Sequence, residues 1–62
     1  AALTRAEMEA LTARMRFAGR LVDRVDGDEQ EVFRVAQAQA GALWDEDTEF
    51  FLQAFVAGRR LE

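Results

Sequence analysis

Apolar residues recur at alternating intervals of three and four along the first 25 residues of the chain. This spacing is typical of helices that pack side by side at a shallow angle. A T-x-x-E capping box, Thr4 with Glu7, marks the start of the helix. The pattern predicts a helix over residues 4–25 with one apolar seam. The seam consists of Met8, Leu11, Met15, Ala18, Val22 and Val25.

The segment "VDGDEQ", residues 25–30, separates this helix from the next. Gly27 is expected to adopt the left-handed conformation just past the helix end. Asp28 with Glu31 repeats the capping-box pattern. Because so short a connection places two helices antiparallel, we expect a helical hairpin whose second helix covers residues 28–44.

The same spacing continues after Phe33 without a change of phase, which favours one long second helix. Gly41, Asp45 and Asp47 favour a break instead, because Gly ends helices and Asp begins them. We predict a third helix over residues 47–60, with continuity between the second and third helices as the alternative. In the last third the spacing falls on Asp47, Phe50, Ala54, Ala57 and Leu61.

A chain of 62 residues forms one small domain, and chains this short bury only about 60% of the surface of their unfolded form. We therefore predict an all-α fold with residues 1–62 as a single domain. The expected architecture is an antiparallel helical hairpin plus a C-terminal helical segment. It closes either as a three-helix bundle or as a dimeric four-helix-type bundle.

The last third of the chain holds more large apolar side chains than one small chain is expected to enclose. On a helical wheel four residues are expected to point in well-separated directions, and a helix that is apolar all round is buried all round. These four are Phe50, Leu52, Phe55 and Val56. Either this segment fills a three-helix core or it lies in an interface, where aromatic residues dominate the binding energy. The predicted interface residues are Trp44, Phe50, Phe51, Phe55, Leu43 and Leu52.

The residue types that are missing exclude most catalytic chemistry. The chain has no His, Cys, Ser, Tyr or Lys, so the usual nucleophiles, the neutral-pH proton shuttle and the soft metal ligands are absent. Paired carboxylates can hydrolyse glycosides, but they need a cleft that a small hairpin does not offer. We expect no enzyme, no catalytic residue and no cofactor.

Two acidic stretches, residues 26–31 and 45–49, are candidate sites for calcium or magnesium, which prefer oxygen ligands. In "DGDEQE" the Gly comes too early for the calcium-loop pattern. Helix capping accounts for both stretches without an ion. We therefore predict no metal site.

Charge is unevenly distributed along the chain. Residues 1–25 carry five Arg against three acids, and residues 26–62 carry three Arg against nine acids. Arg16, Arg20 and Arg24 recur every four residues opposite the seam, and such a row can follow nucleic-acid phosphates. The net charge of −4 and the lack of an aromatic residue on that face disfavour this function. The three Arg are the candidate RNA contacts of the alternative function.

The turn "VDGDEQ" and the seams on either side of it resemble the Rop family of plasmid-encoded helical hairpins. The resemblance covers the first two-thirds of the chain and implies a hairpin that dimerises into a four-helix bundle and binds RNA. In that family polar, basic and aromatic residues of the first helix contact RNA. The corresponding positions here depart from that pattern and hold Ala6, Ala10, Arg14 and Leu21.

The sequence as a whole predicts a non-enzymatic protein–protein interaction module for dimerisation, docking or regulatory adaptation. Its expected partners are a second copy, giving a homodimer, or another protein; the alternative is a small dimeric RNA-binding regulator. No apolar run approaches the roughly 18 residues of a membrane span. The absence of Cys permits a reduced cytosol, and the use of Arg without Lys fits a GC-rich bacterial genome, so we expect a cytoplasmic bacterial protein.

Overall fold

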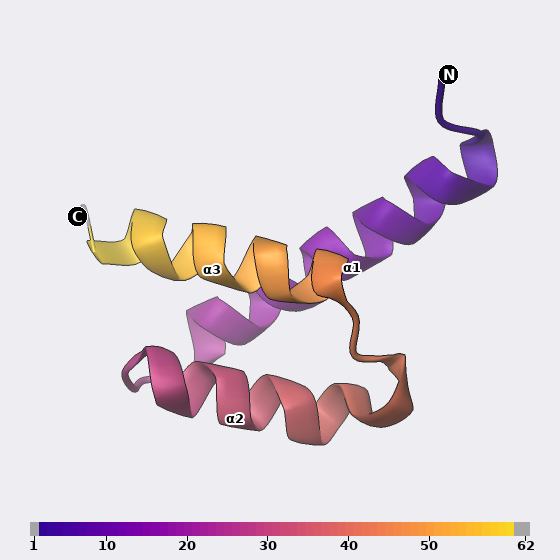
Figure 1. Ribbon diagram of the computed structural model, residues 1–62. Helices are drawn as coiled ribbons and strands as arrows, with labels where there is room; N and C mark the ends of the chain where they lie inside the picture. Colours follow the sequence, from indigo (N-terminus) through magenta and orange to yellow (C-terminus); the bar gives the residue numbers. More distant parts are fainter. Residues whose placement is uncertain (1, 61–62) are drawn as a thin grey trace.

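The computed structural model describes residues 2–60, and residue 60 by its backbone alone. Three α-helices account for most of this range: α1 (Arg5–Arg24), α2 (Glu29–Ala40) and α3 (Glu46–Arg60). A short 3-10 turn, η1 (Gly41–Leu43), follows α2. Residues 2–60 contain no strand, and the helices pack against one another, so the all-α prediction is confirmed (Figure 1).

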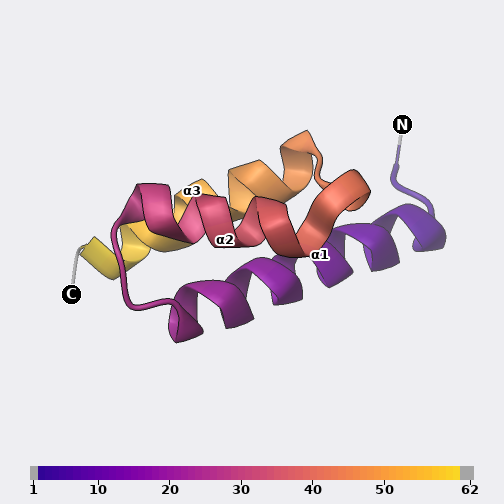
Figure 2. The same ribbon diagram turned by 90° about the horizontal axis from the view of Figure 1, so that it is seen from below.

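The second helix runs antiparallel to the first, as the short turn predicts, and α3 then returns across α1 in the same direction as α1 (Figures 1 and 2). The contact of α1 with α3 is more extensive than its contact with α2. The Cα atoms span 37 × 27 × 16 Å. Because packed helices lie about 8–10 Å apart, the molecule is only about two helix layers deep in its thinnest direction.

The helix starts use the predicted capping residues. The Glu7 N–H donates to Thr4 Oγ1 at 3.1 Å and the Thr4 N–H donates to Glu7 Oε1 at 2.9 Å, so the first capping box is complete. At α2 the Glu31 N–H donates to Asp28 Oδ1 at 2.9 Å, but the Glu31 carboxylate pairs with Arg34. Only one of the two capping-box bonds therefore forms at α2.

The end of α1 differs from the prediction. Gly27 does not have a positive φ; Val25 ends the helix in an extended conformation instead, with φ −88° and ψ 113°. Arg59 of α3 donates hydrogen bonds to the carbonyl oxygens of Val22, Val25 and Gly27 at 3.3, 3.1 and 2.6 Å. The carbonyl oxygens at the end of a helix lack partners within the helix, and a left-handed glycine usually helps to provide them with hydrogen bonds. Here the positively charged Arg59 guanidinium donates these bonds instead. Gly27 is needed for space, because a Cβ there would lie 2.9 Å from Glu31 Cγ.

The chain breaks between the second and third helices near Gly41, as predicted. Gly41 has φ 56° and ψ −126°, a conformation suited to glycine, and α2 ends at Ala40. The Thr48 N–H donates to Asp45 Oδ1 at 2.9 Å, so Asp45 caps α3. The alternative of one continuous long helix is therefore excluded.

The core lies where the three helices meet. Seven apolar side chains are buried there: Ala18, Leu21, Val22, Val32, Ala36, Leu52 and Val56. Among the residues whose burial the structure describes, Thr48 is the one buried polar side chain, and its hydroxyl donates to Asp45 Oδ1 at 2.8 Å. Within the described residues no buried side-chain nitrogen or oxygen lacks a hydrogen-bond partner. The buried polar side chains of this part of the chain therefore all have hydrogen-bond partners. Features that could contact a ligand or partner have to be sought on the surface.

Candidate interaction surface

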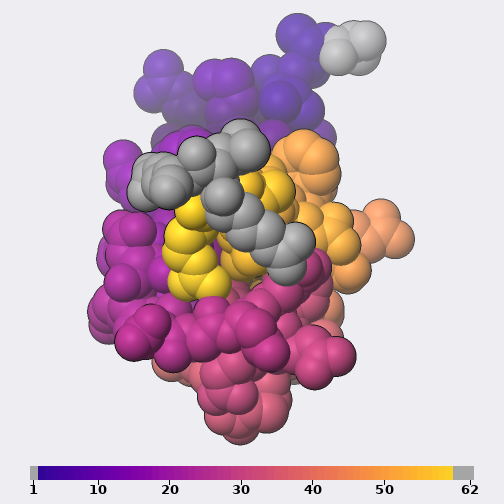
Figure 3. Space-filling model, turned by 90° about the vertical axis from the view of Figure 1, so that its left-hand side faces the viewer, coloured from indigo at the N-terminus to yellow at the C-terminus, as the bar shows by residue number. Residues whose placement is uncertain are grey.

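The first half of α1 extends past the rest of the molecule. Residues 2–10 are all exposed, and the ribbon of this part projects beyond α2 and α3 (Figures 1 and 2). Seen from the opposite end of the molecule, it stands above the other helices (Figure 3). Arg14 binds Asp45 just before α3 begins, so α3 covers α1 only from there onward. We call residues 5–15 the arm.

The arm carries the first half of the predicted seam, and much of this half is exposed. Its three seam residues continue the face of α1 on which Ala18 is buried. Met8 is 53% exposed and Met15 is 41% exposed, whereas Leu11 is half-buried. We call Met8, Leu11 and Met15 the arm stripe. The prediction of a covered seam is therefore correct only for its second half.

A signal for the uncovered arm is present in the helix lengths. Once the chain breaks at Gly41, α2 has 12 residues and α1 has 20. At 1.5 Å per residue these helices are about 18 and 30 Å long. A hairpin with such unequal helices leaves part of α1 without a partner.

Apolar residues lie on both the inner and the outer side of α3. The buried set that faces the core includes Thr48, Leu52 and Val56. Phe50 lies about 160° around the helix from the centre of this set and is 63% exposed. Exposed alanines share its side of the helix. We call this set the outer stripe: Phe50, Ala54 and Ala57.

The outer stripe coincides with the predicted three-four spacing in the last third of the chain. The unbroken phase favoured one long second helix, the alternative that the break at Gly41 excludes. The break at Gly41 redirects the chain, so a phase counted through it no longer says which side of α3 faces α1 and α2. The spacing marks the outside of α3.

Three of the predicted interface residues form one aromatic row on α3. The Phe50 ring lies edge-on to the Phe51 ring with centroids 5.7 Å apart, and the Phe51 ring stacks on the Phe55 ring with centroids 6.3 Å apart. Phe51 and Phe55 are partly buried against the core, whereas Phe50 is the exposed end of the row. The row thus connects the outer stripe with the interior.

The other three predicted interface residues lie at different depths. Leu43, in η1, is 81% exposed. Trp44 is partly buried and lies edge-on to Phe33 with ring centroids 6.4 Å apart. Leu52 is fully buried in the core of its own chain. Leu52 therefore supports α3 from inside and offers no surface to a partner.

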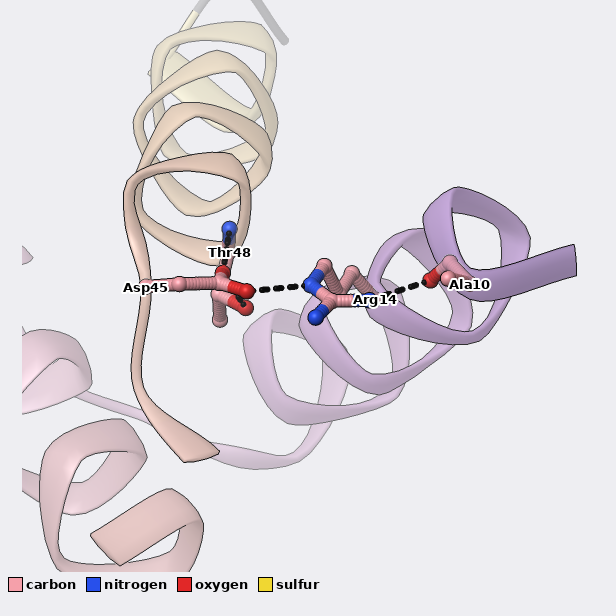
Figure 4. Close-up of polar contacts among 4 residues, drawn as sticks. All are labelled: Ala10, Arg14, Asp45 and Thr48. Atoms are coloured by element: carbon pink, nitrogen blue, oxygen red, sulfur yellow. Dashed lines mark hydrogen bonds and ion pairs between the residues drawn. The ribbon is translucent and has the colours of Figure 1, made fainter. Parts of the chain in front are cut away.

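A polar junction joins the arm to the start of α3. Asp45 accepts hydrogen bonds from the Thr48 N–H, from the Thr48 hydroxyl and from Arg14 Nε (Figure 4). Arg14 Nη1 also donates to the carbonyl oxygen of Ala10 at 2.9 Å. The bonds from Thr48, and then the bond from Arg14, lower the pKa of Asp45 to about 2. This pair is absent from the sequence predictions, although the position of Arg14 near the seam, away from the exposed Arg row, is a signal for it.

An open groove of about 460 Å³ lies beside this junction, between α1, α2 and the start of α3. Apolar side chains supply much of its wall, with Leu43 at the η1 end. Arg14 is the one titratable residue in the lining, and it is bound to Asp45. No acid–base pair converges on the groove, so its shape and chemistry suit an apolar side chain.

The Arg row lies on the exposed outer face of α1. Arg16, Arg20 and Arg24 are all exposed. Among the described residues none of the three forms a hydrogen bond or an ion pair. Their guanidinium groups are free to contact an anionic partner.

The acidic stretches do not converge on a common point. In the part of the chain that the structure describes, no three carboxylates gather into a group that could hold a metal ion. Over the same residues no helix combines the length and the apolar character needed to cross a membrane.

Comparisons of the chain with protein-family models, with curated proteins and with solved structures give no match. The resemblance of the turn to the Rop family therefore has no support beyond the turn and seams themselves. The two uncovered stripes, the groove and the Arg row remain the features from which a function can be argued.

Proposed function

We propose that this chain is a non-enzymatic protein-docking module whose contact surface is built from the arm stripe, the outer stripe and the partly exposed aromatic row between α3 and the core. The observation that carries the proposal is Phe50. An aromatic side chain on the far side of α3 from the core contributes little to the fold of its own chain. Contiguous exposed apolar patches mark contact sites for other proteins, and Phe50 lies on one side of α3 with the exposed Ala54 and Ala57.

The composition supports a contact function over a catalytic one. The chain lacks His, Cys, Ser, Tyr and Lys, and the groove beside Asp45 is lined by no titratable group other than Arg14, which is bound to Asp45. Binding by packing needs none of these chemistries. It needs aromatic and aliphatic anchors that are held rigidly before the partner arrives.

The predicted anchors take different roles in this proposal. Phe50 is the central anchor, and Phe51 and Phe55 hold its ring in place from the side of the core. Leu43 contacts a partner at the rim of the groove, and Trp44 supports this rim through its contact with Phe33. Leu52 contributes only by keeping α3 in position.

Affinity capture with matched variants tests this function. The tagged chain is expressed beside an untagged copy in the cells that make it, and the retained proteins are quantified by mass spectrometry. Phe50→Glu is compared with Gln53→Glu, because both positions are exposed on α3 and receive the same side chain. We expect the wild type and Gln53→Glu to retain the same specific protein and Phe50→Glu to lose it.

Either of two results contradicts the proposal. In the first, the wild type retains no specific protein, neither its own untagged copy nor another. In the second, Phe50→Glu and Gln53→Glu retain the same protein equally.

The Arg row supports a second candidate, binding of RNA through phosphate contacts. The specific observation is that Arg16, Arg20 and Arg24 are exposed and have no ion-pair partner among the described residues. Titration of labelled RNA at two salt concentrations tests it, because phosphate contacts weaken steeply as salt rises. A lack of binding at low salt rules this candidate out.

A further inference from the structure

We infer that the partner on the two stripes is a second copy of this chain, bound so that the arm of each copy lies on the outer stripe of the other. This inference rests on the proposed docking function and names its partner. It follows from the extent of exposed surface, the match between the two stripes and the charges beside them.

The exposed surface is larger than a single folded chain of this size requires. A folded monomer of 7.0 kDa is expected to expose about 4,000 Å², whereas this chain exposes 4755 Å². The radius of gyration of the Cα atoms is 12.1 Å, against about 10.6 Å for a compact chain of 62 residues. The excess area of about 700 Å² per chain is close to the roughly 800 Å² that each partner buries in a standard protein interface.

The two stripes match in length and spacing. Each consists of three residues at intervals of three and four, so each runs for about 10 Å along its helix. The arm stripe is formed by large flexible side chains, including Met8 and Met15. The outer stripe has one large ring, Phe50, followed by two alanines. Methionines packed beside an aromatic ring and against small alanines can fill such a surface closely.

The charges beside the stripes are complementary. A shallow hollow beside Met8 is bordered by Arg5 and Glu9 of the arm and by Arg16 just past its end, which gives this flank a net positive charge. Glu46 and Asp47 lie at the start of α3 on opposite sides of the outer stripe. Neither acid forms an ion pair within the described residues. An arm that lies on the outer stripe therefore brings arginines to unpaired carboxylates.

Two copies can form a closed, two-fold symmetric dimer in which the arm of each lies on the outer stripe of the other. Each chain has one arm and one outer stripe, so a two-fold axis generates two identical contacts and leaves no stripe uncovered. A different protein as the partner would have to supply both complementary surfaces. A second copy already carries them.

Charge reversal tests this arrangement in purified protein. The first variant carries Arg5→Glu and Arg16→Glu, and the second carries Glu46→Arg and Asp47→Arg. Sedimentation measures the mass of the wild type, of each variant and of their mixture, while circular dichroism confirms that each is helical. We expect the wild type to be a dimer and each variant alone to dissociate with a constant at least about tenfold higher.

The mixture of the two variants gives the decisive result. When they pair, the acidic arm meets a basic outer stripe, and the basic arm of the second variant meets an unchanged acidic one. We therefore expect the mixed dimer to form with about the wild-type affinity. Arg20→Glu with Arg24→Glu is the matched control, because it makes the same charge change on the outer face of α1 and should leave the dimer intact.

Met8→Glu provides a readout that unfolding cannot imitate. Met8 belongs to the arm stripe, so a carboxylate at this position should abolish the dimer. Because residues 2–10 are all exposed within the protomer, the same change should leave its helical content unchanged. A wild type that stays monomeric at high concentration overturns the inference. So does a failure of the mixed variants to pair while both remain folded, or a dimer that survives Met8→Glu. A monomeric wild type whose Phe50-dependent capture of another protein persists would overturn only the second-copy inference and leave the docking function standing.

Discussion

The two halves of α1 have the same apolar seam but different surroundings. In the second half, Ala18, Leu21 and Val22 are buried between α2 and α3. In the first half, Met8 and Met15 continue the seam into solvent. The capping box and the seam spacing make both halves helical, so a sequence pattern that forms a helix does not by itself determine which part of the helix is covered.

The boundary between the halves is set by contacts between distant residues. Arg14 binds Asp45 where α3 begins, and Arg59 binds the end of α1 where α3 finishes. Between these two contacts α3 lies along α1, and before them the exposed start of α1 projects beyond α2 and α3 (Figures 1 and 2). The covered half thus stabilises the fold, and the uncovered half is available for binding.

The largest expected effect comes from a core truncation in the covered half. Leu21→Ala removes a side chain that is fully buried, and such changes cost about 2–5 kcal/mol in the free energy of unfolding. Met8→Ala in the arm should change the same quantity by no more than about 0.5 kcal/mol. Urea unfolding of dilute protein measures both. Equal losses would mean that the arm is packed in solution like the rest of α1.

A second effect concerns the hydrogen bonds from Arg59 of α3 to the end of α1. Arg59→Met keeps most of the aliphatic stem of the side chain but removes three hydrogen bonds to the end of α1. Loss of charged hydrogen bonds of this kind should lower the free energy of unfolding by about 1–3 kcal/mol. Arg20→Met is the control, since Arg20 is exposed and should tolerate the change. If thermal unfolding of the two variants were the same, Arg59 would not hold the end of α1.

A third effect separates local from global stability. Thr4→Ala removes the cap of the arm, which should cost about 1 kcal/mol in the first turn of α1. Because residues 2–10 are all exposed, only the exchange of the amide hydrogens in this part of α1 should become faster, by about fivefold. Asp28→Ala makes the equivalent change at α2, which is packed, and should lower global stability instead. A global loss from Thr4→Ala would contradict the separation of the two halves.

The smallest effect is the pH dependence of the junction. The pKa of Asp45 lies at about 2 in the folded chain against an ordinary value of 3.8. Folding therefore favours the ionised carboxylate, and the resulting stability is complete above pH 3.8 and is lost as the pH falls from there towards about 2. Hydrogen bonds also lower the pKa values of Glu7 and Glu31, so their loss adds in the same direction.

The melting temperatures of the wild type and Asp45→Asn isolate the contribution of Asp45. The difference between them should be constant near neutral pH and shrink as the pH drops through this window. A difference that stays constant down to about pH 2 would show that the Asp45 carboxylate is not held in its ionised form by folding.

Local signals in the sequence account for much of this fold. The capping box at Thr4, the cap at Asp28 and the break near Gly41 are each encoded within a few residues, and all three are present in the structure. These signals also imply the hairpin and the three-helix arrangement. These local signals specify where each helix begins and ends.

Contacts between distant residues were not predicted. The bonds from Arg59 to the end of α1 replace the expected left-handed glycine, and no spacing within either helix indicates them. The same limit applies to the candidate surface. The sequence places Phe50 and Leu52 together among the predicted interface residues, but only the direction of the chain after Gly41 decides that Phe50 faces outward while Leu52 faces inward.

The more extensive contact of α1 with α3 than with α2 has a consequence for how the chain folds. The first two helices are neighbours in sequence, yet much of what holds α1 in place arrives only with the third helix. A hairpin of α1 and α2 alone lacks Leu52 and Val56 and has too little buried surface to offset the entropy of ordering its helices. Folding should therefore occur as one all-or-none transition, limited by the search of α3 for its place rather than by formation of the turn.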